Sequence, residues 1–103
     1  MIRHFVHLSF RSDVTNVEKK LLYSELSKLS GHIDGILDFK YYCNISVETP
    51  LVHNFLDMFW FDFRDKSVRD IYLNDNIHKE IGKRIVEKLD GGLNGIFVCD
   101  IEL

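Results

Sequence analysis

The sequence predicts an α+β fold in which helices cover one face of a four-stranded antiparallel sheet. Four segments alternate apolar with other residues, as strands do, and the segments between them repeat apolar residues at helical spacing. Their order is strand, helix, strand, strand, helix pair and strand, which is the order of a split β-α-β domain. The chain has 103 residues, 46% of them hydrophobic, so residues 1–103 are expected to form a single domain around one core.

The first strand and the first helix come at the start of the chain. The strand runs from Ile2 to Phe10, and its even-numbered residues form an apolar row that His4 interrupts. Thr15 and Glu18 have the spacing of a capping box, which predicts a helix that reaches about Ser30. This helix should turn one apolar stripe toward the sheet, made of Leu22, Leu26, Leu29 and Ile33.

Two strands follow, with a loop around Pro50 between them. The second strand runs roughly from Leu37 to Ile45, and the third from Asn54 to Phe63. Alternate residues of the third strand fall into two rows, one with Phe55, Asp57, Phe59, Phe61 and Phe63, the other with Leu56, Met58, Trp60 and Asp62. Because both rows are largely apolar, both faces of this strand should be covered.

A short helix follows the third strand. Asp65 can cap it, and Val68, Ile71 and Tyr72 have helical spacing within it. The polar run Asn74–Asn76 breaks this helix before the last one begins.

The last helix carries the most informative residue of the chain. It runs from Ile77 to Leu89, and His78 falls within its apolar stripe, with Gly82 one turn further along. A helix turns such a stripe toward the protein interior, so we expect the imidazole to be enclosed beside a position without a side chain. The glycines after Asp90 end the helix, and the last strand runs from Gly95 to Leu103.

This order is that of a ferredoxin-like domain, whose sheet has a second face that is bare in a monomer. So large an apolar surface implies a partner, most simply the same face of a second copy. We therefore predict a homodimer in which two sheets pair face to face into an α/β barrel. The predicted interface contains Phe5, His7, Met58, Trp60 and Phe97, with Leu56, Cys99 and Ile101 beside them.

Composition excludes several classes of partner. The net charge is −3 and no basic cluster is present to neutralise phosphates, so nucleic acid is not expected. No segment approaches ~18 apolar residues and the amino terminus lacks a signal-peptide pattern, which predicts no membrane and a cytoplasmic protein. Cys43 and Cys99 lack CxxC spacing and are expected to be reduced, packed thiols. No cofactor motif is present, and we predict no cofactor and no metal.

Three stretches of the chain resemble the stress-responsive α/β barrel (Dabb) family. They are the opening Met1–Phe10, the Gly35–Leu37 segment before the second strand, and Tyr72–His78. The resemblance covers nearly the whole chain and implies ferredoxin-like protomers that pair sheet to sheet. The family includes a plant polyketide cyclase branch, that of olivetolic acid cyclase, and many members without an assigned activity.

The resemblance also implies a site. In the cyclase a Tyr and a His six residues later carry out the proton transfers of an aldol-type ring closure, and Tyr72 and His78 match this pair in type and spacing. The cyclase's first-strand His and last-strand Asp are matched by His4 and Asp100. The usual His-Pro-x-His run, however, is Asp75-Asn76-Ile77-His78 here.

Phe59 and Phe61 also depart from the family pattern, because they stand where smaller pocket residues are expected. Large rings at these two positions argue against a large substrate.

Strand order gives an independent argument about the same end of the sheet. The last strand is antiparallel to the first, so His4 and Asp100 should be neighbours. We expect Asp57, near the start of a third strand parallel to the first, to lie at the same end. A carboxylate beside an imidazole favours the imidazolium or fixes its tautomer, whereas desolvation acts in the opposite sense. In a small apolar pocket here, His78 would take a proton from a carbonyl compound and Tyr72 would hydrogen-bond the oxyanion.

Each of these residues has a structural alternative. His78 can be a hydrogen-bonded core histidine, the Tyr72 hydroxyl can bond a backbone carbonyl, and His4 with Asp100 can lock the sheet end. A metal site of His4, His78, Asp57 and Asp100 has suitable ligand types but no short-range ligand motif.

The alternative function is a non-catalytic stress-responsive or small-molecule-binding dimer. A cofactor-free monooxygenase rests on fold analogy alone, and a haem-binding version would need an exposed axial ligand that the sequence does not identify.

Overall fold

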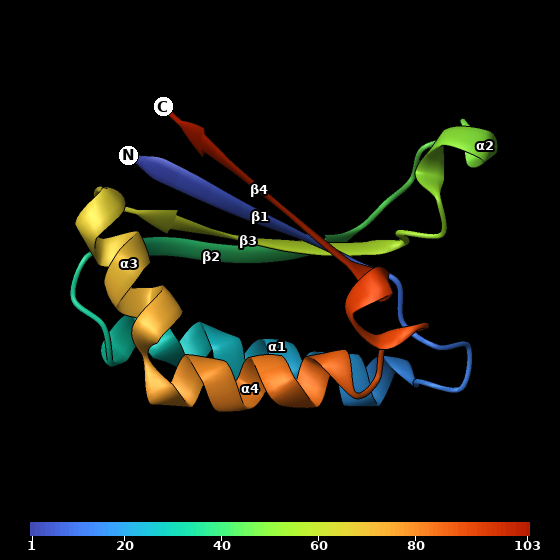
Figure 1. Cartoon of the computed structure of the whole chain (residues 1–103), viewed down its shortest axis with the longest axis horizontal. Coiled ribbons are helices and arrows are strands. Elements are labelled where there is room, and N and C mark those ends of the chain that lie inside the picture. The colour runs from blue at the N-terminus through green and yellow to red at the C-terminus, as the bar shows by residue number, and fades with distance from the viewer.

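The computed structural model describes residues 1–103 and has helices on one face of a four-stranded antiparallel sheet (Figure 1). The strands are β1 (Ile2–Leu8), β2 (Ile36–Cys43), β3 (Asp57–Phe63) and β4 (Ile96–Glu102), in the order β2-β3-β1-β4. β1 therefore pairs with β3 on one side and with β4 on the other. The predicted fold class is confirmed.

The helices form a second layer. They are α1 (Asn16–Ser27), continued by the short turn η1 (Lys28–Gly31), and α3 (Lys66–Asn74) followed directly by α4 (Asn76–Val86). The Thr15 hydroxyl accepts the N–H of Glu18 at 3.2 Å, so α1 begins where the sequence predicts. Another short turn, η2 (Gly92–Gly95), leads into β4. No helix is both long enough and apolar enough to span a membrane.

Element boundaries differ from the sequence prediction where the backbone turns. β1 ends at Leu8, because the N–H and carbonyl of Ser9 bond to Gly95 and Asp90 in the connection before β4. His53 and Asn54 have positive φ angles of 52° and 62°, and the Phe55 N–H donates to the Val52 carbonyl in a turn, so β3 begins at Asp57 and not at Asn54. The predicted loop around Pro50 contains a short helix, α2 (Thr49–Val52), in whose first turn a proline is tolerated.

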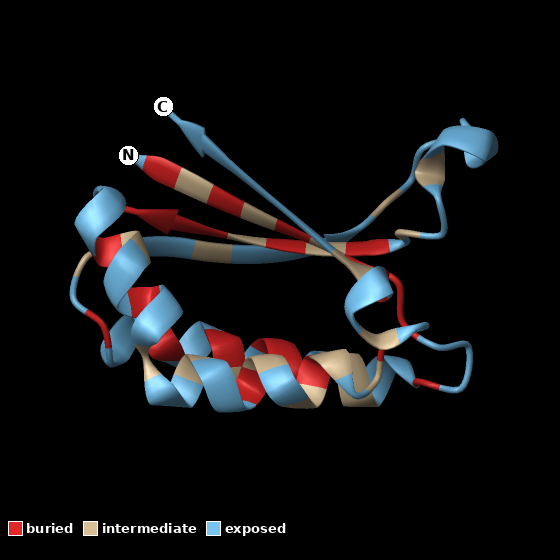
Figure 2. Ribbon diagram, viewed as in Figure 1, coloured by how far each residue is buried: buried red, intermediate tan, exposed pale blue.

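The core lies between the sheet and the helices (Figure 2). The predicted α1 stripe is buried throughout, and the helix-facing row of β3 packs against it and against α3. Two predicted core residues are exposed, Ile71 by 54% and Ile77 by 50%. α3 packs through Val68 and Tyr72, so Ile71 points away from the sheet, and Ile77 lies in the first turn of α4, on its outer side.

The opposite face of the sheet is uncovered in the protomer. Its central rings pair across the strands, Phe5 beside Trp60 at 5.7 Å and His7 beside Phe97 at 5.6 Å between ring centroids. Met58 lies next to His7 in the register, and the Trp60 indole N–H has no hydrogen-bond partner. We call these five residues, Phe5, His7, Met58, Trp60 and Phe97, the open face.

Both cysteines differ from the expectation of packed thiols, because Cys43 and Cys99 are exposed in the protomer. Cys43 is the last residue of β2, which forms one edge of the sheet, and Cys99 lies on β4, which forms the other. Edge strands have a neighbour on one side only, so a strand-like pattern alone does not bury their side chains.

Candidate functional site

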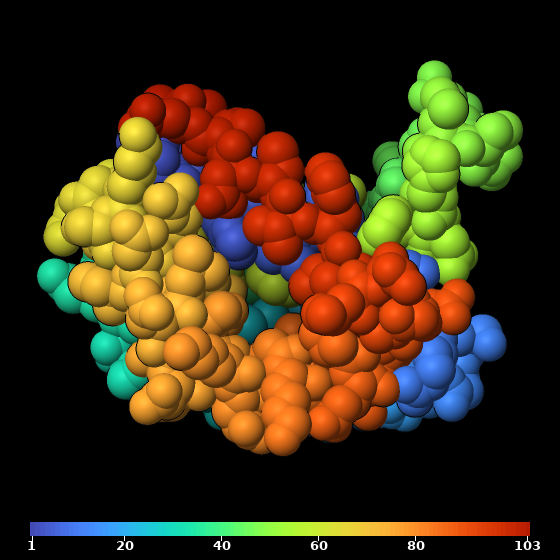
Figure 3. Space-filling model, viewed as in Figure 1, coloured from blue at the N-terminus to red at the C-terminus, as the bar shows by residue number.

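A cavity of about 300 Å³ lies between the sheet and α4. It opens in the hollow that Figure 3 shows between α3, α4 and the start of β4. Nine of its thirteen lining residues are hydrophobic, and the lining consists of His4, Val6, Leu26, Phe59, Tyr72, Leu73, His78, Lys79, Gly82, Ile85, Val86, Ile96 and Val98. An apolar wall of this kind removes water from the few polar groups that face it.

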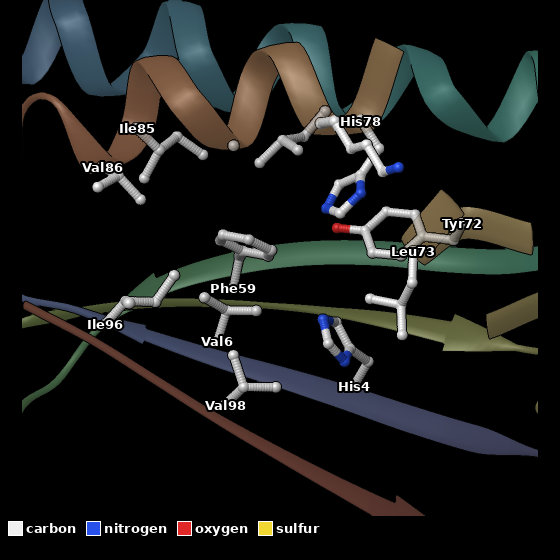
Figure 4. Close-up of a pocket in the computed structure, with 13 residues that line it drawn as sticks. His4, Val6, Phe59, Tyr72, Leu73, His78, Ile85, Val86, Ile96 and Val98 are labelled. Carbon is white, nitrogen blue, oxygen red and sulfur yellow. The ribbon is translucent and has the colours of Figure 1, made fainter. Parts of the chain in front are cut away.

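Tyr72 and His78 meet at the corner between α3 and α4. Asp65 caps α3 by accepting the N–H of Val68, and Asp75 caps α4 by accepting the N–H of His78 at 2.9 Å. These two caps fix where each helix begins. The centroids of the Tyr72 and His78 rings lie 3.8 Å apart. The Tyr72 hydroxyl points into the space between α4 and the sheet (Figure 4).

Burial sets the protonation state of this pair. Desolvation by burial lowers the pKa of His78 to about 4, so the imidazole is neutral at pH 7. Its Nδ1 is buried and has no hydrogen-bond partner. Burial raises the pKa of Tyr72, so its hydroxyl stays protonated and can donate.

His4 is the second imidazole on the cavity. It is 5% exposed, and its Nδ1 lies 2.6 Å from Oδ1 of Asp100, as the antiparallel register predicts. Burial outweighs the attraction of Asp100 and lowers the pKa of His4, so this ring is neutral as well. A neutral ring beside a carboxylate places its proton on Nδ1, which leaves Nε2 toward the cavity (Figure 4).

Arg69 completes this arrangement and was not among the residues singled out from the sequence. Its guanidinium lies 3.2 Å from Oδ2 of Asp100, the oxygen that His4 does not use. The only sequence signal is its position in α3, three residues before Tyr72, which places both on one side of the helix. Arg69 thus holds Asp100 through the carboxylate oxygen that His4 leaves free.

Gly82 and Phe59 line the cavity as expected, but Phe61 does not. A Cβ on Gly82 would meet no atom within 4 Å, so this turn of α4 leaves the cavity open. Phe61 is fully buried and packs against the Tyr72 ring at 4.9 Å, with the tyrosine between it and the cavity. The expectation that Phe61 is a pocket residue is therefore wrong.

Asp57 lies at the other end of the sheet, which corrects a second expectation. It is opposite Leu8 in the register, whereas His4 is opposite Phe61 and Asp100. Four residues of strand separate the two positions by ~13 Å. Asp57 instead lies 2.9 Å from the Lys19 ammonium, so the four ligands of the alternative metal site are not brought together.

Comparisons with known proteins agree with this architecture. A family model described as Stress responsive A/B Barrel Domain matches residues 2–103. A dimeric ferredoxin-like protein of unknown function from Jannaschia sp. CCS1 is 24% identical with a TM-score of 0.88, over 99% of this chain and 98% of that one. An Arabidopsis thaliana protein is 20% identical with a TM-score of 0.88, over 100% and 95% of the two chains.

A hydroxynitrile lyase from Passiflora edulis is 12% identical with a TM-score of 0.82, over 99% and 92% of the two chains. At these identities the likeness concerns the fold and selects no substrate. No curated protein matches the sequence.

The low pKa of His78 predicts a loss of stability in mild acid. The unfolded chain protonates its histidines below about 6.5, whereas folded His78 takes up a proton only near a pKa of about 4. Its contribution is therefore complete above pH 6.5 and decreases as pH falls from 6.5 toward 4. Melting temperatures across this window should decrease less for His78→Leu than for the wild type. The exposed-loop variant His53→Asn should follow the wild type, and an equal slope for all three proteins would contradict a desolvated His78.

Proposed function

The chain belongs to the stress-responsive A/B barrel domain family, and on that premise we propose that it is a homodimer whose cavity binds a small carbonyl compound and catalyses proton transfer on it without a cofactor. One observation carries this proposal. Two neutral imidazoles and one protonated phenol, from different elements of the fold, face a single apolar cavity.

The chemistry assigns His78 as the base. A neutral imidazole can take a proton from the carbon next to a carbonyl group, and the electron pair of the broken C–H bond moves onto the carbonyl oxygen. The Tyr72 hydroxyl, protonated and directed into the cavity, can donate a hydrogen bond to that oxygen as charge develops. General base help of this kind is typically worth ~10²- to 10⁴-fold in rate.

His4 supplies a second position for the proton. If its Nε2 accepts a proton, Asp100 at 2.6 Å stabilises the imidazolium that forms. Asp100 in turn is held by Arg69, so the ring keeps one orientation through the cycle. His4 is thereby a second base in the cavity, and each imidazolium returns to the substrate the proton that it took.

The dimensions and lining of the cavity limit the substrate. A volume of about 300 Å³ is at the lower end of small-molecule sites. The Phe59 ring and the apolar residues of α4 and β4 would strip water from a charged ligand without replacing it. A small uncharged carbonyl compound fits both limits.

A non-catalytic ligand-binding dimer is the second candidate. The observation in its favour is the pKa of His78 of about 4, because so weak a base gains little from proton abstraction at neutral pH. Under this alternative the same cavity binds an apolar molecule, and the imidazoles only orient it.

The open face supports the homodimer. Its rings are partly exposed in the protomer, and the Trp60 N–H lacks a partner there. A contiguous apolar surface of this kind on a soluble protein is typical of an interface, and the similar structure from Jannaschia sp. CCS1 is described as dimeric.

Proton abstraction is testable without knowing the natural substrate. We expect the wild type to accelerate exchange of the α-protons of butanone and cyclohexanone in D₂O, followed by NMR, and His78→Gln to lose ~10²- to 10⁴-fold of this rate. Because His78 is the base when unprotonated, the rate should rise with pH through a pKa of about 4 and stay level near neutrality. His53→Asn serves as the control. Exchange at the buffer rate, or full activity in His78→Gln, would favour the binding protein.

The assembly is testable through Trp60. Trp60→Asp should convert the dimer into a monomer or an aggregate in native mass spectrometry, since a carboxylate buried without a partner is costly. Leu21→Asp, on the exposed side of α1, is the matched control and should remain dimeric. A stable Trp60→Asp dimer would show that the open face is not the interface.

A further inference from the structure

A second cavity, of about 350 Å³, lies where the first turns of α1 meet the outer edge of the sheet. It is lined by residues of α1, β2 and the start of β3, and shares no residue with the cavity that contains His78. Its lining is also different in kind, since it contains lysine, asparagine and aspartate side chains together with tyrosine rings.

The one carboxylate in this cavity, that of Asp57, already has partners within the protein. Asp57 is buried, and its Oδ2 lies 2.9 Å from the Lys19 ammonium. The Cys43 thiol lies 3.9 Å from the other carboxylate oxygen. Buried charges are tolerated when paired in this way, and Asp57 is therefore not available to a ligand.

The groups left without partners can all donate hydrogen bonds. Tyr23 is 4% exposed and its hydroxyl is buried with no hydrogen-bond partner, which is unfavourable in a folded protein. Burial raises the pKa of Tyr23, so the hydroxyl keeps its proton. Lys20, three residues earlier on α1, forms no ion pair, and the Asn16 side chain forms no hydrogen bond. A ligand that satisfies these groups must supply acceptors, and an excess of lysine over aspartate favours an anion.

The aromatic side chains add a flat surface. The rings of Tyr23 and Tyr41 stack with centroids 4.3 Å apart and an interplanar angle of 18°. Tyr41 is 44% exposed, so part of its ring is free to contact a bound molecule. Stacked tyrosines next to donors are suited to a planar ring that carries acceptor oxygens.

We propose that this second cavity binds a small aromatic carboxylate, whose oxygens accept hydrogen bonds from Tyr23 and Lys20 and whose ring contacts Tyr41. The site is independent of the proposed proton-transfer site, because the two cavities have no residue in common. The protein would then bind two ligands, an uncharged one in the first cavity and a negatively charged one in the second.

Titration of the ¹⁵N-labelled full chain with sodium benzoate tests the proposal. We expect saturable shifts of the backbone amide resonances of Lys20, Tyr23 and Tyr41, and none at Gly82 or Val98 of the first cavity. Cyclohexanecarboxylate should bind more weakly because it lacks the flat ring, and benzyl alcohol should not bind because it lacks the charge. The variant His78→Gln should bind benzoate like the wild type, which separates this test from that of the proposed function.

Two substitutions locate the contacts. Tyr23→Phe removes only the unpartnered hydroxyl, so it should melt at or above the temperature of the wild type and yet bind benzoate about tenfold more weakly or worse. Lys20→Gln should weaken binding by up to about fivefold, whereas Lys28→Gln, beyond the end of α1, should not change it. Absence of saturable shifts, shifts confined to the first cavity, or unchanged affinity in Tyr23→Phe would each overturn the proposal. Equal affinity for cyclohexanecarboxylate would overturn the aromatic class.

Discussion

The packing of the Tyr72 ring is the interaction on which the rest of the site depends. The ring lies 4.9 Å from both Phe61 and Phe63 of β3, 5.6 Å from His4 of β1 and 3.8 Å from His78 of α4, between centroids. It thus ties the corner between α3 and α4 to the centre of the sheet. Because a buried ring is held by contacts on all sides, it fixes the distance between the two histidines and closes one end of the cavity.

The same packing determines the electrostatics. Removal of water lowers the pKa of both histidines, although His4 has a carboxylate beside it that acts in the opposite direction. Desolvation prevails, so Asp100 fixes the tautomer of His4 rather than charging the ring. The protein thereby holds two bases in their neutral form within an apolar space, and an ionised phenolate is excluded from it.

Much of the fold and part of the site follow from the sequence, and the difference has a physical cause. Alternation along β1 and β3 predicts which side chains face the helices, and the antiparallel order predicts the contact between His4 and Asp100. Alternation cannot distinguish Phe59 from Phe61, since both face the helices and only the position of the Tyr72 ring separates them. The expectation for Asp57 assumed a third strand parallel to the first; the two strands are antiparallel, so the start of β3 lies beside the end of β1.

The most direct test of this account is a pH titration of the histidine ring nitrogens by ¹⁵N NMR. We expect His78 to titrate with a pKa of about 4 and His4 with a pKa below its ordinary value. At pH 7 His4 should carry its proton on Nδ1, toward Asp100, with Nε2 unprotonated. Titration of either ring at or above about 6.5, or a proton on Nε2 of His4, would contradict the central claim that the cavity keeps two oriented imidazoles neutral.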